Sequence, residues 1–201
     1  MQQIAIGLFA EGNTDYRYFS VFLERYITTY FITQGIDVDL QSPLHIYIKG
    51  KDFITSMKAI EENYSGLHAI FVHMDADSHN DENVQWRKWQ PWLQQCKHRQ
   101  KWIAMIPVRM LESWLLADQQ ALKKTFILKD DFLATYLGSR NVESIDNPKE
   151  ILNQLIRLGK QKNTFDYHEV LAKRVAFQEL ERLSSFQKFQ RAVAQSFQGY
   201  A

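Results

Sequence analysis

Carboxylate side chains follow several apolar segments of this chain, each at a point where a strand would end. They are Glu11, Asp75, Asp77 and Glu112. Carboxylates crowded together repel one another and raise one another's pKa, and a hard divalent cation relieves that repulsion. Two such ions about 3.5–4 Å apart would stabilise both the attacking and the leaving oxygen of a phosphate. The sequence therefore predicts a Mg²⁺ or Mn²⁺ site for phosphodiester chemistry.

The pair Asp75 and Asp77 is the most compact part of this set. Alternate residues of an extended strand point to the same side, so two aspartates separated by one residue can present their oxygens together if the backbone stays extended. An isolated Asp-x-Asp is more often turn chemistry than a metal site. The interpretation as a metal site therefore depends on the other acids lying nearby.

Alternating strands and helices are expected to bring those acids together. Apolar patterns predict strands at residues 4–9, 44–48, 69–72 and 102–106, with helices at 16–31, 53–64, 84–97 and 111–117 between and after them. Such alternation implies right-handed crossovers and a parallel sheet whose strands all end at one edge, where ligands bind. We therefore expect an α/β fold in which a mostly parallel sheet of about four strands is flanked by helices.

The rest of the chain reads as helical. No strand pattern is convincing after Asp118, whereas helices are predicted from Asn147 onward and over residues 167–197. We expect a catalytic core over residues 1–118 and a helical extension over residues 119–201 that packs on it.

Composition sets broader limits. The 201 residues are 45% hydrophobic, which suits one well-buried core, and the formal net charge of +1 gives no global sign of a nucleic-acid binder. The single cysteine excludes a disulfide framework and cysteine-type zinc sites. No leader or membrane span is recognisable, so we expect a soluble, cytoplasmic protein with no membrane partner.

Three motifs together resemble the TOPRIM fold. They are EGNTD at residues 11–15, HMDAD at 73–77 and PVRMLESW at 107–114. More narrowly, the chain is similar to a bacterial TOPRIM-like family of unknown function whose members are often encoded beside an ABC-type ATPase in phage-defence systems. The resemblance covers about residues 4–118, and the helical tail more loosely. It implies that Glu11 is the general acid or base and that Asp75 and Asp77 bind Mg²⁺.

The same resemblance implies a nuclease that cuts DNA or RNA as the effector of a phage-defence system, with an ATPase partner. The alternative is a non-catalytic TOPRIM-like module that binds or regulates such an ATPase complex. A metal-dependent phosphatase acting on a small nucleotide would use the same acids in a narrower cleft. Metal-dependent stabilisation distinguishes a functional acid cluster from a degenerate one.

Several neighbouring residues have two interpretations. Glu112 either binds metal or stabilises the start of a helix. Arg109 is the preferred cation for a phosphate, with Lys49 and Lys51 as further substrate-binding candidates, and its alternative is an ion pair with one of the same carboxylates. His73 is favoured as a packing residue.

The Trp-rich segment at residues 86–92 has a similar pair of interpretations. Its aromatic side chains, with basic residues nearby, could stack on single-stranded nucleic acid. Their spacing of three residues favours a core or partner interface instead, because it places them along one face of a helix.

Overall fold

The computed structural model describes residues 1–46, 58, 60, 62, 66–78, 84–94, 101–160 and 166–200, with backbone alone for 84, 85, 88, 89 and 92. Two compact units make up the chain. The first comprises Met1–Met74, Val84–Met105 and Phe189–Ala201, and the second comprises Asp75–Asn83 and Ile106–Lys188.

A four-stranded parallel sheet forms the centre of the first unit. Its strands lie in the order β4 (Leu44–His45), β2 (Ile6–Phe9), β5 (Ala69–His73) and β6 (Trp102–Met105). Each neighbouring pair is parallel. The predicted α/β fold with a mostly parallel sheet flanked by helices is confirmed.

The first apolar run is divided into two strands, where a single one was predicted. Strand β1 (Gln2–Ile4) pairs in parallel with β3 (Val38–Leu40), and β2 begins only at Ile6. Between them the Ala5 amide donates a hydrogen bond to Nδ1 of His68 at 3.0 Å. A side chain thus takes the place of a neighbouring strand at Ala5, and the run changes pairing partner there.

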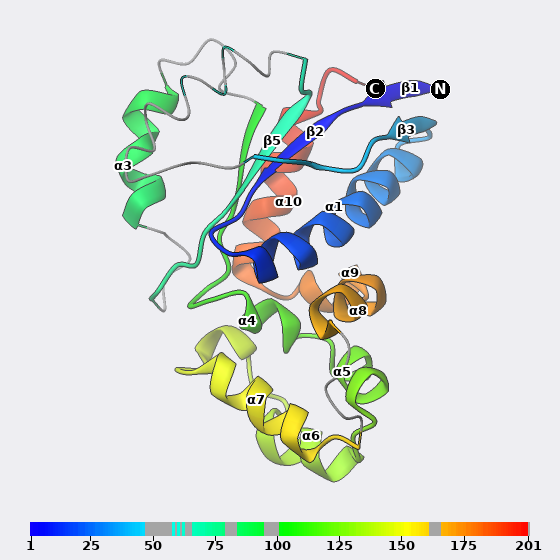
Figure 1. Ribbon diagram of the computed structural model, residues 1–201, viewed down its shortest axis with the longest axis vertical. Coiled ribbons are helices and arrows are strands. Elements are labelled where there is room, and N and C mark those ends of the chain that lie inside the picture. The colour runs from blue at the N-terminus through cyan, green and yellow to red at the C-terminus, as the bar shows by residue number, and fades with distance from the viewer. Residues whose placement is uncertain are drawn as a thin grey trace. The chain divides into compact units, whose positions relative to one another are not determined.

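One face of this sheet is covered by α1 (Asn13–Thr33) and by residues 189–196 of α10 (Ser184–Ser196), as Figure 1 shows. On β5, the alternate residues Phe71 and His73 face these helices. The ring centroids of Phe71 and Phe189 are 6.1 Å apart, and those of His73 and Phe19 are 4.4 Å apart. Strand periodicity therefore assigns the intervening residues of β5 to the opposite face.

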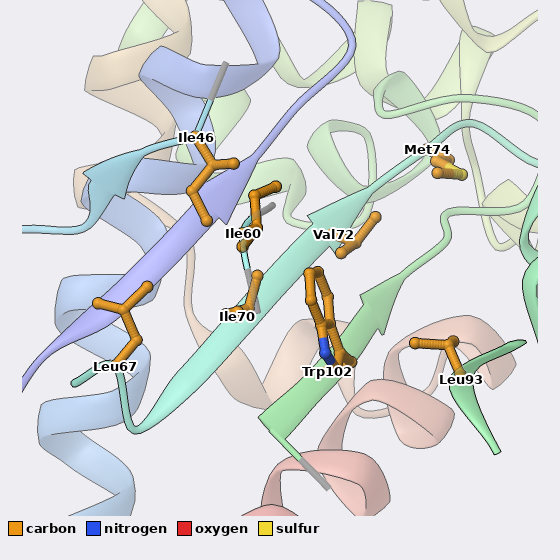
Figure 2. Packing of buried hydrophobic residues seen from close by; sticks show 8 residues of the cluster. All are labelled: Ile46, Ile60, Leu67, Ile70, Val72, Met74, Leu93 and Trp102. Atoms are coloured by element: carbon orange, nitrogen blue, oxygen red, sulfur yellow. The ribbon is translucent and has the colours of Figure 1, made fainter. Parts of the chain in front are cut away.

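The opposite face carries the apolar cluster drawn in Figure 2. Its members are Ile46, Ile60, Leu67, Ile70, Val72, Met74, Leu93 and Trp102. Helix α3 (Val84–Leu93) supplies Leu93, and the partly buried Trp86 packs against the same cluster, which supports the core interpretation for that tryptophan. Gly7 lets Ile46 pack closely against β2, since a Cβ atom at this position would lie 2.5 Å from Cδ1 of Ile46 and would make that side chain shift.

Helices make up the second unit. They are α4 (Glu112–Leu115), α5 (Gln119–Phe126), α6 (Asp130–Tyr136), a 3₁₀ turn η2 (Val142–Ser144), α7 (Pro148–Leu158), α8 (Tyr167–Arg174), α9 (Phe177–Leu180) and the start of α10. Helix α7 begins as predicted, with Oδ1 of Asn147 accepting from the Glu150 amide at 3.1 Å. Beyond Asp118, the described residues contain no strand.

The segment over residues 167–197 is helical, as predicted, but it forms three helices. The chain leaves α8 at Val175 and Ala176, which have extended backbone, and starts again in α9 and α10. The Ala176 amide donates instead to Oδ2 of Asp118 at 2.9 Å. Interior helical periodicity continues across the break, so the pattern gave no sign of it.

Among the described residues, no helix combines the length and the apolar character that crossing a bilayer requires.

Candidate metal-binding and catalytic site

Three parallel strands of the first unit end level with one another. Phe9 at the end of β2 lies opposite Val72, and His73 at the end of β5 lies opposite Met105. The chain therefore leaves β2, β5 and β6 at the same edge of the sheet. Glu11 follows β2 by two residues and is exposed just before α1.

The other acidic candidates belong to the second unit, where backbone pairing continues past the strands. The amide of Ala76 donates to the Pro107 carbonyl at 3.2 Å, and that of Asp77 donates to the Arg109 carbonyl at 2.9 Å. In return, the Arg109 amide donates to the Ser78 carbonyl at 3.0 Å. We call residues 75–78 the acid loop. These bonds bring the acid loop, with Asp75 and Asp77, beside residues 107–109, which include Arg109.

Asp75 also joins the acid loop to the start of α4. Its Oδ1 atom accepts a hydrogen bond from the Leu111 amide at 2.8 Å, one residue before Glu112. A carboxylate in this position stabilises exposed amides at the beginning of a helix. Asp75 is half-buried.

Asp77 does not have the conformation on which the Asp-x-Asp argument depended. Its φ of 53° lies in the left-handed region, so residues 75–77 are not continuously extended. Strand alternation therefore does not align the two side chains, and that reason for grouping them is wrong. Asp77 is exposed, and aspartate is one of the few non-glycine residues that tolerate this region well.

Arg109 faces Asp77 across the paired backbone and is also left-handed, with a φ of 63°. Its Nη2 atom lies 3.0 Å from Oδ1 of Asp146, in the segment before α7. Asp146 is not one of the metal-site carboxylates that were predicted as alternative partners of Arg109. Because Asp146 is 85% exposed, this ion pair contributes no more than about 1 kcal/mol.

Glu112 is the first residue of α4 and is half-buried. Burial raises the pKa of the Tyr167 hydroxyl, and the negative charges of Glu112 and Asp166 raise it further. Glu112 thus acts electrostatically on an aromatic hydroxyl at the start of α8. The sequence analysis missed Tyr167, because no motif connects residue 167 with the acid loop.

Two other ionisable residues have structural roles. Asp118 is buried, and its two oxygens accept from the amides of Ala121 and Ala176, both at 2.9 Å. His73 is buried, and burial lowers its pKa to about 3 although a hydrogen bond with the Met105 carbonyl opposes the shift. The Nδ1 atom of neutral His73 donates that bond at 3.2 Å, and Nε2 lies 3.9 Å from Oδ2 of Asp15. The packing interpretation of His73 is therefore the better one.

Metal ligands were predicted at Asp75, Asp77 and Glu112. Within the described residues, no group of three or more His, Cys, Asp or Glu side chains is arranged so that it could hold a metal ion. Mg²⁺ does not require such a group, because it keeps several waters and binds through one or two carboxylates together with substrate phosphates. Lys49 and Lys51, the predicted substrate-binding lysines, lie outside the described residues.

Comparisons with protein-family models, curated proteins and solved structures find no match to this chain. The resemblance to TOPRIM proteins therefore rests on the three sequence motifs.

Proposed function

We propose that this chain is a metal-dependent nuclease of the TOPRIM type, in which Asp75 and Asp77 hold Mg²⁺ or Mn²⁺ and Glu112 supports the site. The observation that carries the proposal is the bond from the Leu111 amide to Oδ1 of Asp75. It connects the two acidic segments of the second unit, which are more than thirty residues apart in the sequence. A divalent ion at these carboxylates would polarise the phosphate that is cleaved.

The protein groups contribute charge and position. Exposed Asp77 and half-buried Asp75 and Glu112 can supply oxygen ligands without the full desolvation that a buried carboxylate suffers. Arg109 forms an ion pair with the exposed carboxylate of Asp146, and such an exposed pair is weak. A substrate phosphate could replace Asp146 and form a charge-assisted, bidentate contact with Arg109. We infer that Arg109 binds the phosphate on which negative charge develops.

Glu11 belongs to the first unit, and its role as general acid or base is inferred from the EGNTD motif. The resemblance is likewise the support for DNA or RNA as the substrate, for a phage-defence role and for an ABC-type ATPase as the partner.

One observation favours the non-catalytic alternative, a TOPRIM-like module that binds or regulates an ATPase complex. Oδ1 of Asp75 accepts from an amide at the start of α4, which gives this aspartate a structural use. If stabilising α4 were the whole role of Asp75, removing its charge would change the stability of the protein and would affect no metal-dependent property.

Cleavage assays on mixed single- and double-stranded DNA and RNA, with Mg²⁺ or Mn²⁺, test the proposal. Wild type should cleave, and the double variant Asp75→Asn/Asp77→Asn should lose at least about 100-fold in rate, because removing catalytic electrostatic stabilisation costs rates of this order. The matched control is Asp130→Asn/Asp131→Asn, which removes two neighbouring exposed acids of α6 in the same unit. Equal rates for all three proteins, or no cleavage by wild type in either metal, would favour the binding module.

A further inference from the structure

An aromatic pair in the first unit is not explained by the acid loop. The rings of Tyr16 and His45 are stacked, with centroids 3.8 Å apart and planes inclined by 23°. Tyr16 lies in the first turns of α1, and His45 ends the edge strand β4. Sequence analysis passed over both residues, since they are 29 positions apart and belong to no shared motif.

Regular structure holds both rings in place. His45 pairs with Leu8 of β2, and the Ile46 amide donates to the Leu8 carbonyl at 2.8 Å. The Tyr16 hydroxyl donates to the Pro43 carbonyl at 3.3 Å, which fixes its ring against the chain that enters β4. A binding surface made of such anchored rings loses little conformational entropy when a ligand arrives.

His45 is exposed while Tyr16 is half-buried. The tyrosine therefore acts as the support, and the imidazole is the ring that meets solvent. Leu44, the neighbouring residue on β4, is 45% exposed and alternates to the other side of the strand.

His45 of the aromatic pair lies beside the end of β2. Leu8, opposite His45, is one residue before the end of β2, and exposed Glu11 follows three residues after Leu8. The aromatic pair thus lies at the carboxyl edge of the parallel sheet, where ligands of such sheets bind. Glu11, the predicted acid or base, is at the same edge of the same unit.

We propose, on the basis of the nuclease function above, that His45 stacks on an unpaired nucleobase of single-stranded DNA or RNA, with Tyr16 as its support. An exposed, anchored ring offers a π face that every base can use, and such contacts tolerate any sequence. A base-paired duplex keeps its bases stacked on one another and offers this ring only its ends. We therefore infer that this edge of the first unit binds single strands in preference to duplexes.

Binding of fluorescein-labelled dT₈ and rU₈, followed by anisotropy in EDTA so that no cleavage occurs, tests the proposal. The change His45→Ala should weaken binding at least about fivefold, because each base stacked on an aromatic side chain contributes to affinity on this scale. His45→Phe should restore the affinity, since it keeps an aromatic face. Leu44→Ala, on the same strand and also exposed, should leave it unchanged.

Two further probes isolate the base. An abasic oligonucleotide of the same length should bind wild type and His45→Ala equally, and an eight-base-pair duplex should compete poorly with dT₈. The proposal is overturned if wild type binds neither labelled strand, if His45→Ala binds as tightly as wild type, or if the abasic strand shows the same difference between the two proteins.

The inference and the nuclease proposal fail in different ways. Cleavage by wild type together with unchanged binding by His45→Ala would remove the stacking role and leave the nuclease. Stacking that depends on His45, without cleavage in either metal, would leave a single-strand binding protein.

Discussion

Two groups of acids in the second unit differ in how far the fold removes them from solvent. Buried Glu143 accepts from the amides and hydroxyls of both Ser184 and Ser185, at 2.6–3.0 Å. Buried Asp118 similarly accepts from two amides. The acid loop is different, because Asp77 is exposed and Asp75 is only half-buried.

The difference separates acids that hold the fold from acids that remain able to bind a ligand. A buried carboxylate is stable only when donors replace the water it has lost, and Glu143 and Asp118 obtain those donors from helix starts. The role of Glu143 and Asp118 is to accept hydrogen bonds from donors of the same chain. The acid loop keeps its charge near solvent, where a cation can reach it.

The largest effect expected from this comparison is on stability. Glu143→Ala should lower the free energy of unfolding by about 3–4 kcal/mol, because two amides and two hydroxyls at the start of α10 would lose their acceptor. Urea unfolding measures the change. Glu150→Ala, which removes an exposed glutamate from the first turn of α7, is the control and should cost less than about 1 kcal/mol. Similar losses of unfolding free energy in Glu143→Ala and Glu150→Ala would show that the buried acids do not hold the fold more strongly than exposed ones.

A second prediction extends the comparison to the imidazoles, since His73 is buried and His45 is exposed. The pKa of His73 is lowered to about 3, whereas an unfolded histidine titrates near 6.5. As the pH falls below 6.5, the unfolded chain binds a proton that folded His73 does not, so the folded state becomes less stable. Between pH 7 and pH 5 this single group should reduce the free energy of unfolding by about 2 kcal/mol.

The variant His73→Phe lacks that titration. Its free energy of unfolding should therefore fall less between pH 7 and pH 5 than that of wild type, by the same amount. The comparison uses the change with pH rather than the absolute values, because the variant also loses the bond to the Met105 carbonyl at every pH. Equal pH dependence in both proteins would show that His73 does not remain neutral in the folded state.

The smallest expected effect on stability is at the acid loop itself. Asp77→Asn keeps the size of the side chain and suits the left-handed backbone, so the free energy of unfolding should change by less than about 0.5 kcal/mol. Thermal unfolding in EDTA measures this. A loss above about 2 kcal/mol would place Asp77 with Glu143 and Asp118 as an acid that holds the fold.

The apolar pattern predicted β5 closely because all five residues of this strand are buried. The run over residues 69–72 is continuously apolar, and the observed β5 extends it by His73 alone. The pattern at residues 4–9 concealed the break at Ala5, because that break depends on His68, more than sixty positions away. Periodicity likewise did not show the interruption between α8 and α9, which depends on Asp118.

The candidate site was predictable in its residues and less so in its geometry. The motifs located Asp75, Asp77, Arg109 and Glu112, and the structure joins their segments by backbone pairing. The left-handed conformations at Asp77 and Arg109 follow from that pairing and have no local signature such as glycine. Asp146 precedes α7 and Tyr167 begins α8, both far along the chain from the motifs, so only the folded chain connects them with Arg109 and Glu112.

The central claim, that the acid loop binds a divalent metal, is tested most directly by calorimetric titration of Mn²⁺ into wild type and Asp75→Asn/Asp77→Asn. We predict a saturable heat in wild type that is lost in the double variant and retained in Asp130→Asn/Asp131→Asn. A titration in which wild type and the double variant behave alike, whether both bind Mn²⁺ or neither does, would contradict the account.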